Sequence, residues 1–260
     1  MPGDHDIEYT DEFITKLQIA FGKGFLSPGG MEEVAKIVEG IDLNGKKVLD
    51  IGVGIGGPAC LLVTNHGAGK VTGIDVEEPV LKEAQATVSS RNLQNQIDLQ
   101  LVEPGPLPFD AATFDIVFSK DSIIHIPDKR ALFGEVYRVL KPGGWVVMSD
   151  WYCSEEPFSE EMSSWVERTG LSFAMTPIQN DGSLLGELGF SDTAILDRNE
   201  WFADFSRKLV DQMGGPGYSY MVATLGQDDA DDWLARANAR AAISAQGQLR
   251  PGHIRGHKPI

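Results

Sequence analysis

The chain has 260 residues, of which 42% are hydrophobic and 23% charged, so it can bury a full globular core. Its formal net charge of −16 argues against a nucleic-acid partner, because phosphates require a basic surface. No stretch is apolar for the length of a membrane span, so no membrane partner is expected. The acidic first residues predict neither a signal peptide nor a transit peptide.

The two cysteines, Cys60 and Cys153, lie far apart and lack the spacing of metal ligands. They favour a reducing cytoplasm over a disulfide-stabilised secreted protein, and no metal is expected. The chain carries neither an internal repeat nor a low-complexity linker, so residues 1–260 are expected to form a single domain. The sequence leaves the oligomeric state open.

Short apolar runs alternate with amphipathic segments through the first half of the chain. The expected strands are residues 46–52, 70–76, 97–102, 114–119 and 145–150, and the expected helices are 57–64, 77–92 and 128–144. A nearly all-apolar run such as KKVLDIG is typical of a central parallel strand. Strands that alternate with helices at this spacing predict an α/β fold with a doubly wound parallel sheet.

The regular alternation loosens after residue 150. Further helices are expected over 157–175, 183–190, 198–213 and 228–245, with a sixth strand over 193–197 and a last edge strand over 252–259 beside it. The extra helices should cap the carboxyl edge of the sheet, where open α/β sheets bind ligands. The domain then divides into a lid or cap (1–40), a cofactor-binding core (41–150) and a remainder with acceptor-binding helical insertions (151–260).

A glycine-rich turn follows the first strand in VLDIGVGIGGPA, and it contains Gly52, Gly54, Gly56 and Gly57. A tight strand-to-helix turn needs some glycine in any case. Here Asp50 ends the strand before the turn, and Asp75 ends the next strand. An acid there can accept both hydroxyls of a ribose, while the glycines let the backbone approach the ligand. A nicotinamide dinucleotide is one candidate ligand, although the loop that binds it in dehydrogenases has a different glycine spacing.

The Gly-x-Gly-x-Gly loop resembles motif I of class I S-adenosylmethionine-dependent methyltransferases. The segments PFDAATFDIVFSKDSIIHIPDK and VLKPGGWVVMSD resemble later motifs of that family, in the same order. The resemblance implies a Rossmann-like, seven-stranded sheet, S-adenosylmethionine as methyl donor and S-adenosylhomocysteine as product. It also implies a set of cofactor-binding residues, in which Asp50 and Gly52 contact the methionine part, Asp75 the ribose and Val76 the adenine, with Ser27, Gly54, Gly56, Pro106 and Lys120 completing the set.

Two further segments narrow the resemblance. YTDEFITKLQIAFGKGFLSPGG (9–30) and GELGFSDTAILDRNEWFADFSRKL (186–209) resemble phosphoethanolamine N-methyltransferases. In that family an Asp and a His spaced like Asp121 and His125 form the catalytic pair, and a Tyr matching Tyr9 closes a lid. Sarcosine and dimethylglycine methyltransferases carry a similar D-x-x-x-H-x-P-D-K segment, so the motif implies a small amine acceptor without fixing a phosphate.

The chemistry of amine methylation explains why this pair is useful. An amine is mostly protonated at neutral pH, and a positioned histidine can remove that proton. Asp121 is expected to orient the His125 ring and stabilise its charged form. The alternative is that His125 has only a structural role, as a cap of its loop or a partner of the cofactor.

The anion of the acceptor is expected to meet cationic side chains of the cap. From residue 233 to the last residue the chain has no acid, and it is basic overall. The arginines of this stretch are either ordinary surface residues or part of the pocket. The resemblance adds further positions, and the acceptor-binding candidates are Tyr152, Arg168, Arg236, Arg240 and Arg250. Leu17 stands where the resembling family has a phosphate-binding tyrosine, and arginine forks onto phosphate or carboxylate alike.

The sequence therefore predicts an S-adenosylmethionine-dependent methyltransferase that acts on a small polar acceptor, with an amine nitrogen as the favoured site. The amine would be of the phosphoethanolamine or the glycine, sarcosine and dimethylglycine type. The alternatives are an S- or O-methyltransferase of another small metabolite, and a cofactor-binding partner protein without activity.

Overall fold

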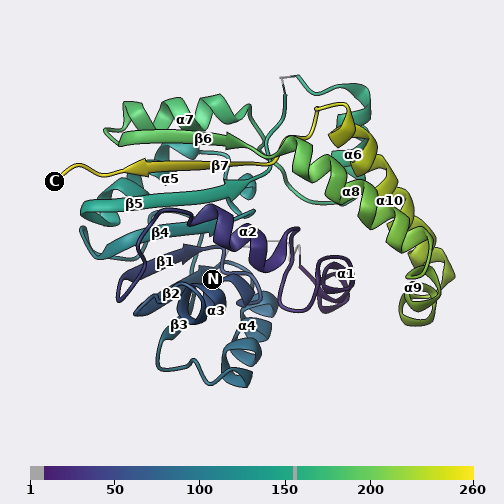
Figure 1. The fold of residues 1–260 in the computed structure, drawn as a ribbon, viewed down its shortest axis with the longest axis horizontal. Coiled ribbons are helices and arrows are strands. Elements are labelled where there is room, and N and C mark those ends of the chain that lie inside the picture. Colours follow the sequence, from purple (N-terminus) through teal and green to yellow (C-terminus); the bar gives the residue numbers. More distant parts are fainter. Residues whose placement is uncertain (1–8, 155–156) are drawn as a thin grey trace.

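The computed structural model describes residues 9–154 and 157–260. One seven-stranded sheet, in the order β3-β2-β1-β4-β5-β7-β6, runs through this part of the chain (Figure 1). Its strands are β1 (Lys47–Ile51), β2 (Lys70–Asp75), β3 (Ile97–Leu101), β4 (Phe114–Lys120), β5 (Leu140–Asp150), β6 (Ser191–Asp197) and β7 (Gly252–His257). The first five strands pair in parallel, and β7 is antiparallel to both of its neighbours. The predicted fold class is confirmed.

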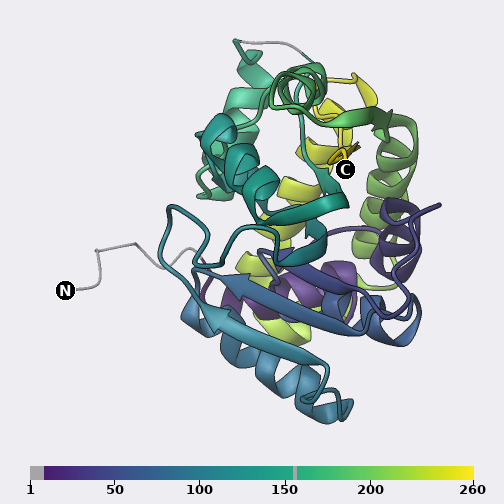
Figure 2. The same ribbon diagram turned by 90° about the vertical axis from the view of Figure 1, so that its left-hand side faces the viewer.

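Helices cover both faces of the sheet (Figure 2). On one face they bury Val34, Leu62 and Leu81, and on the other Phe133 and Leu185. The helices of the first face are α2 (Gly30–Ile37), α3 (Gly57–Thr64) and α4 (Glu78–Ser90), and those of the second are α5 (Lys129–Val139) and α7 (Ile178–Glu187). Every residue of β1 after the first is buried, because apolar side chains cover both faces of a central parallel strand.

The remaining helices gather at the carboxyl ends of the parallel strands (Figure 1). They are α1 (Asp11–Phe21), α6 (Glu160–Thr169), α8 (Asn199–Gly214), α9 (Tyr218–Leu225) and α10 (Gln227–Ala245). Leu209, Met221 and Ala237 join α8, α9 and α10 in one apolar cluster, to which α1 adds Phe21. Helix α1 and the helices after β5 thus form the cap, whereas α2, which the sequence analysis assigned to the lid or cap (1–40), covers a face of the sheet.

Several elements differ from the sequence-based expectation. The helices expected over 157–175 and 183–190 are found at Glu160–Thr169 and Ile178–Glu187. The last strand was expected at the edge, but β7 lies between β5 and β6, so β6 is the edge strand. Ile254 is buried in β7, whereas most residues of β6 are exposed. The helix expected over 128–144 ends at Val139, because Pro142 cannot continue a helix and the chain enters β5 at Leu140.

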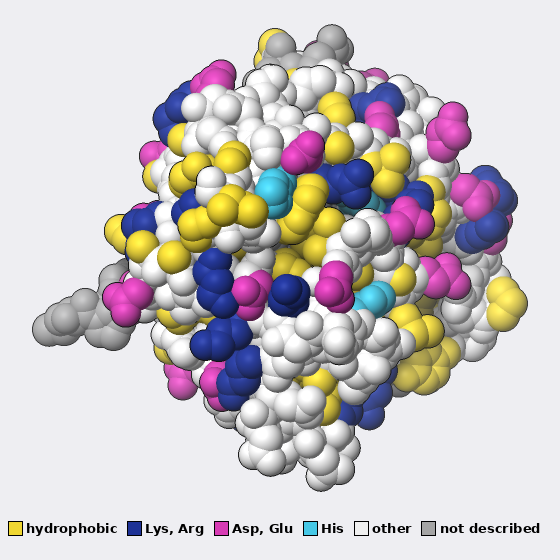
Figure 3. Space-filling view, turned by 60° about the vertical axis from the view of Figure 1, so that its left-hand side comes forward, with side chains coloured by type: hydrophobic (Ala, Val, Ile, Leu, Met, Phe, Trp, Pro, Cys, Tyr) yellow, Lys and Arg dark blue, Asp and Glu magenta, His cyan; other side chains and the backbone are white. Residues whose placement is uncertain are grey.

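The surface mixes charges of both signs. Basic side chains lie among acidic ones on the face drawn in Figure 3. Exposed ion pairs join Lys36 to Glu39 at 2.6 Å and Lys70 to Asp98 at 2.9 Å. Such pairs contribute little to stability, which therefore rests on the buried clusters. In the described part of the chain, we find no helix with the length and apolar character needed to cross a membrane.

Candidate active site

A cavity of about 110 Å³ opens between the sheet and the cap. Asp121 and His125 reach it from the segment that follows β4, and Trp151 reaches it from the end of β5. Helices α1 and α10 close the opposite side with Phe13 and Trp233, whose rings meet edge to face at 6.0 Å. The cavity therefore occupies the sheet edge at which α/β folds bind ligands.

Tyr9 and His125 contact each other in the wall of this cavity. The Tyr9 hydroxyl lies 3.2 Å from His125 Nε2, and His125 Nδ1 lies 3.0 Å from the carbonyl oxygen of Ser172. A carbonyl can only accept, so Nδ1 carries the proton that it donates to Ser172. In the neutral ring, Nε2 then holds the lone pair and accepts from the Tyr9 hydroxyl. The ring is thereby set up to take up a proton on the cavity side.

Asp121 is held by a different set of partners from the one expected. Its carboxylate accepts from Lys120 Nζ at 2.6 Å and from Ser149 Oγ at 2.8 Å. At Nδ1, the carbonyl of Ser172 takes the orienting position that the sequence analysis expected of Asp121. Asp121 also has a φ of 55°, a left-handed conformation that is uncommon outside glycine and recurs at functional sites. This conformation directs the backbone into the short 3-10 helix η1 (Ile123–His125) that carries the histidine.

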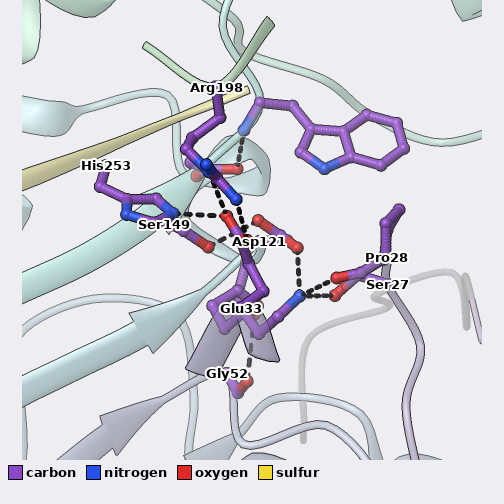
Figure 4. A network of polar contacts seen from close by, with 12 residues as sticks. Ser27, Pro28, Glu33, Gly52, Asp121, Ser149, Arg198 and His253 are labelled. Carbon is purple, nitrogen blue, oxygen red and sulfur yellow. Dashed lines mark hydrogen bonds and ion pairs between the residues drawn. The ribbon is translucent and has the colours of Figure 1, made fainter. Parts of the chain in front are cut away.

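Lys120 joins the N-terminal segment to the active-site carboxylate (Figure 4). Its ammonium donates to Ser27 Oγ at 2.7 Å, to the carbonyl of Pro28 at 2.8 Å and to Asp121. Only 2% of the Lys120 side chain is exposed, so the charge has left water and depends on these three acceptors. Lys120 and Ser27, both predicted as cofactor-binding, thus have a structural link to each other.

A second buried network lies beside this one and joins three distant elements (Figure 4). Glu33 on α2 accepts from Arg198 Nε at 3.0 Å and Nη2 at 2.7 Å, and lies 2.6 Å from His253 Nε2 on β7. Burial alone would raise the pKa of Glu33, but the hydrogen bonds from His253 and Arg198 outweigh it and hold the pKa at about 2. The network fixes α2, and the loop before it, against β7 and the start of α8.

The glycine loop after β1 has the geometry that a close backbone approach requires. Gly52 has a φ of 69°, and a Cβ at this position would lie 2.2 Å from the Cβ of Ser122. Gly54, with a φ of 55°, donates its backbone N–H to Asp75 Oδ2 at 3.0 Å. Gly56 forms the left-handed N-cap of α3. The loop is therefore tied to the end of β2, as expected for a nucleoside-binding turn.

Two carboxylates at the ends of β1 and β2 are largely buried, and one of them has an oxygen without a hydrogen-bond partner in the described part of the chain. Asp50 Oδ2 has no hydrogen-bond partner among the described residues, and burial, with the nearby charge of Asp75, raises the pKa of Asp50 to about 8. Burial also raises the pKa of Asp75 to about 6, against the lowering effect of backbone N–H groups. Val76 is 48% exposed and Pro106 is exposed in the loop after β3. A ligand with an ammonium group, ribose hydroxyls and an adenine fits this set, because it can satisfy Asp50 and cover Val76.

The segment before α2 packs over the glycine loop, where the methyl donor is expected to bind. Tyr9, Ile14 and Leu26 pack in one cluster with Ile55 of the glycine loop and Val80 of α4. Leu26 also lines the cavity. The segment before α2 thus contacts the glycine loop on one side and the acceptor cavity on the other. The lid predicted over 1–40 includes residues 1–8, which lie outside the described part of the chain.

The five residues predicted to bind the acceptor separate into two groups. Arg236 and Arg240 line the cavity, although Arg236 Nε is paired with Asp232 at 2.6 Å. The structure does not bring Tyr152, Arg168 and Arg250 to the wall. Tyr152 is buried in the sheet core, Arg168 is exposed on α6, and Arg250 is paired with Asp197 at 2.5 Å.

The sequence reasoning missed the aromatic wall of the cavity. Trp165 stacks on Trp151 at 5.8 Å and on Phe173 at 5.9 Å, and all three rings line the cavity. Trp151 stands directly before Tyr152, and its position at the carboxyl end of β5 was the signal that could have identified it. The carbonyl of Ser172 had no such signal, because any residue supplies one.

Comparisons with known proteins agree with this geometry. Residues 49–148 match a family model described as a methyltransferase domain. A phosphoethanolamine N-methyltransferase of Triticum aestivum is 31% identical over 254 residues, which cover 97% of this chain and 49% of that protein. The enzyme of the same name from Plasmodium falciparum is 28% identical over 199 residues, 75% of this chain and 73% of that protein. The chain spans about half the length of the plant relatives it matches.

Solved structures show the same relationship. Phosphoethanolamine N-methyltransferase 2 of Haemonchus contortus, in complex with phosphomonomethylethanolamine and S-adenosylhomocysteine, matches with a TM-score of 0.88 and 25% identity, over 98% of this chain and 59% of that one. A putative sarcosine dimethylglycine methyltransferase from Galdieria sulphuraria matches with a TM-score of 0.75 and 20% identity, over 88% and 85% of the two chains, and shares the fold.

The sheet order and the glycine loop are those of the class I methyltransferase fold, and residues 49–148 match a methyltransferase domain. Within that class it resembles the phosphoethanolamine N-methyltransferases, as its N-terminal segment and its Asp121–His125 motif predicted.

Proposed function

We propose that the chain methylates the amine nitrogen of a small acceptor at the cavity between the sheet and the cap. The observation that carries this proposal is the contact of Tyr9 with His125 Nε2 in the cavity wall, beside Asp121. An amine needs a free lone pair to react, and this group of side chains has the means to remove its proton.

Tyr9 and His125 act together on that proton. The Tyr9 hydroxyl donates to Nε2, so its oxygen lone pairs are directed away from the imidazole and can accept from an amine in the cavity. As the amine proton passes to the Tyr9 oxygen, the Tyr9 proton passes to Nε2. The carbonyl of Ser172 stabilises the resulting imidazolium, because it already accepts from Nδ1–H.

Asp121 positions the amine nitrogen of the acceptor. Its carboxylate accepts one hydrogen bond at each oxygen, and a carboxylate has about four acceptor positions. The free positions can accept the remaining N–H groups of the acceptor and hold the lone pair toward the donor. Lys120 holds the carboxylate in place by its contact at 2.6 Å.

The donor side uses the residues that fit S-adenosylmethionine, namely Asp50, Gly52, Asp75 and Val76. This donor supplies a methyl group on a positively charged sulfur, so that an N–C bond forms while the C–S bond breaks and its electron pair stays on sulfur. Asp75 would accept the ribose hydroxyls, and Asp50 would face the ammonium group of the methionine part. The packing of Tyr9, Ile14 and Leu26 over the loop would exclude water from the reaction.

The proposal is tested by measuring S-adenosylhomocysteine release and product mass with phosphoethanolamine, glycine, sarcosine and dimethylglycine. With whichever amine reacts, His125→Ala should lower kcat by about 10²–10⁴-fold while donor affinity by calorimetry is unchanged, the usual size of a general-base contribution. His66→Ala, at the end of α3 and outside the cavity, is the matched control. A His125→Ala protein of nearly full activity would reduce this histidine to a structural residue.

A double variant tests whether Tyr9 and His125 transfer the amine proton together. Because Tyr9 and His125 handle one proton as a unit, Tyr9→Phe combined with His125→Ala should be no slower than the slower single variant. Multiplicative losses would show that the two side chains act independently. If the chain is instead a cofactor-binding partner protein without activity, the donor product should raise its melting temperature while no amine does.

A further inference from the structure

The acceptor cavity is unusually apolar for a site that takes a charged metabolite. Trp151, Trp165 and Phe173 form one side of the wall, and Phe13 and Trp233 form the other, together with Leu17 of α1. Aromatic and aliphatic surfaces of this kind favour an apolar ligand, and they make it costly to bring in a strongly hydrated anion.

Most polar side chains in the wall already have partners within the protein. Ser27 Oγ accepts from Lys120, and Thr169 Oγ donates to the carbonyl of Val166 at 2.7 Å. Arg236 is in an ion pair with Asp232 four residues earlier on α10. These groups therefore have less capacity left for an acceptor than their chemical types suggest.

Arg240 differs from them. The residue is 9% exposed, its Nε has no hydrogen-bond partner, and no carboxylate is paired with it in residues 9–154 and 157–260. The guanidinium lies over the rings of Phe21 at 5.3 Å and Phe202 at 5.9 Å. Burial lowers the pKa of Arg240 to about 10, so the group is charged at neutral pH. A buried charge without a counter-ion is destabilising, and an incoming anion would remove that penalty.

We propose that the acceptor is an amino carboxylate with an apolar body, such as an amino acid with an apolar side chain, in place of an aminoalkyl phosphate. This proposal rests on the proposed function. One guanidinium pairs with one carboxylate through two parallel N–H···O bonds, and Arg240 supplies one such fork. A phosphate dianion carries three strong acceptor oxygens and more charge, and so needs more donors than Arg240 offers alone. The aromatic wall then contacts the apolar side chain.

The first test compares acceptors on the full chain with saturating S-adenosylmethionine. L-phenylalanine and L-leucine should be methylated with a kcat/KM at least tenfold above that of phosphoethanolamine, with the product mass raised by one or more methyl groups. If phosphoethanolamine is preferred, amine methylation stands and the carboxylate assignment is wrong. If no amine reacts although the donor binds, the proposed function fails and this inference fails with it.

The second test removes either the carboxylate of the acceptor or the guanidinium of Arg240. Phenethylamine is phenylalanine without its carboxylate, so wild-type protein should prefer phenylalanine by about 10–100-fold, the size of one charge-assisted hydrogen-bonded contact. Arg240→Met should bring that ratio close to one by raising the KM for phenylalanine, while leaving the KM for the donor unchanged. A ratio that is the same in both proteins would overturn the role of Arg240.

Two controls separate this result from a folding defect. Methionine fills the apolar site without a buried charge, so Arg240→Met should keep or raise the melting temperature. Arg207→Met makes the same change on the exposed side of α8, where Arg207 is paired with Asp204 at 2.6 Å, and should leave the phenylalanine-to-phenethylamine ratio as in the wild type. A ratio that falls equally in both variants would contradict the proposal.

Discussion

Replacing Glu33 by glutamine should destabilise the protein far more than a typical surface change. The glutamine keeps the shape of the side chain but removes the charge that faces Arg198 and His253. Glu33 is 5% exposed, so the arginine would be left partly buried without its counter-ion. Breaking one partner of a buried pair costs about 3–5 kcal/mol.

The structure places the expected cost at the lower end of that range. The Arg198 side chain is 19% exposed, so water screens part of the charge that Glu33 would leave behind. We therefore expect a loss of about 3 kcal/mol in the free energy of unfolding. For a chain of this size that loss corresponds to a fall in melting temperature of roughly 6–12 °C.

The contribution of Glu33 to stability should depend on pH in a direction that can be measured. The pKa of Glu33 is about 2 in the folded protein against an ordinary value of 4.5, so the folded state favours the ionised form. Its contribution to stability is fully present above pH 4.5 and is lost as the pH falls toward 2. The stability difference between wild type and Glu33→Gln should shrink over that window.

Thermal and urea unfolding at several pH values measure both effects. Glu39→Gln, which removes an exposed partner of Lys36, is the control and should leave the melting temperature unchanged. A Glu33→Gln protein as stable as wild type at pH 7, or a difference that does not depend on pH between 5 and 2, would refute the reasoning.

Three further predictions concern the donor site. Asp75→Ala should weaken binding of S-adenosylhomocysteine by about 1.5–3 kcal/mol in calorimetry, and wild-type affinity should fall as the pH drops through about 6, where Asp75 becomes protonated; equal affinities would remove Asp75 from the site. Asp50, with a pKa of about 8, should release a proton at pH 7 when the donor binds, so the heat of binding should vary with the ionisation enthalpy of the buffer. Gly52→Ala should abolish donor binding through its clash with Ser122, and a Ser122→Gly second change should restore part of it; full binding by the single variant would contradict the close approach.

The donor half of the site was predictable because its residues are close in sequence. Asp50, the glycine loop and Asp75 sit at the ends of two adjacent strands, and parallel pairing brings those ends together. The strand-to-helix pattern that predicts the sheet therefore also places the carboxylates. The same reasoning placed Asp121 and His125 at the neighbouring strand end, at the same edge.

The acceptor half depends on side-chain direction, which the sequence did not specify. Trp151 and Tyr152 leave the end of β5 together, and successive residues of an extended chain point to opposite sides, so one lines the cavity and the other enters the core. Arg240 and Arg250 have the same charge, yet α10 directs the first inward, while Asp197 binds the second. Only the packing of the cap distinguishes these two arginines. Ser172 orients the His125 ring through its backbone carbonyl, which every residue type has.

The position of β7 between β5 and β6 affects how the chain is made in the cell. Glu33 and His253 are 220 residues apart in the sequence, and β5 pairs with a strand that begins only at Gly252. During synthesis β5 is made about a hundred residues before β7, an interval of roughly 5–20 s at typical elongation rates. For that time β5 presents an unpaired edge, a template for association with other chains. Any ligand that binds the folded core, the methyl donor included, would stabilise it against association at this edge.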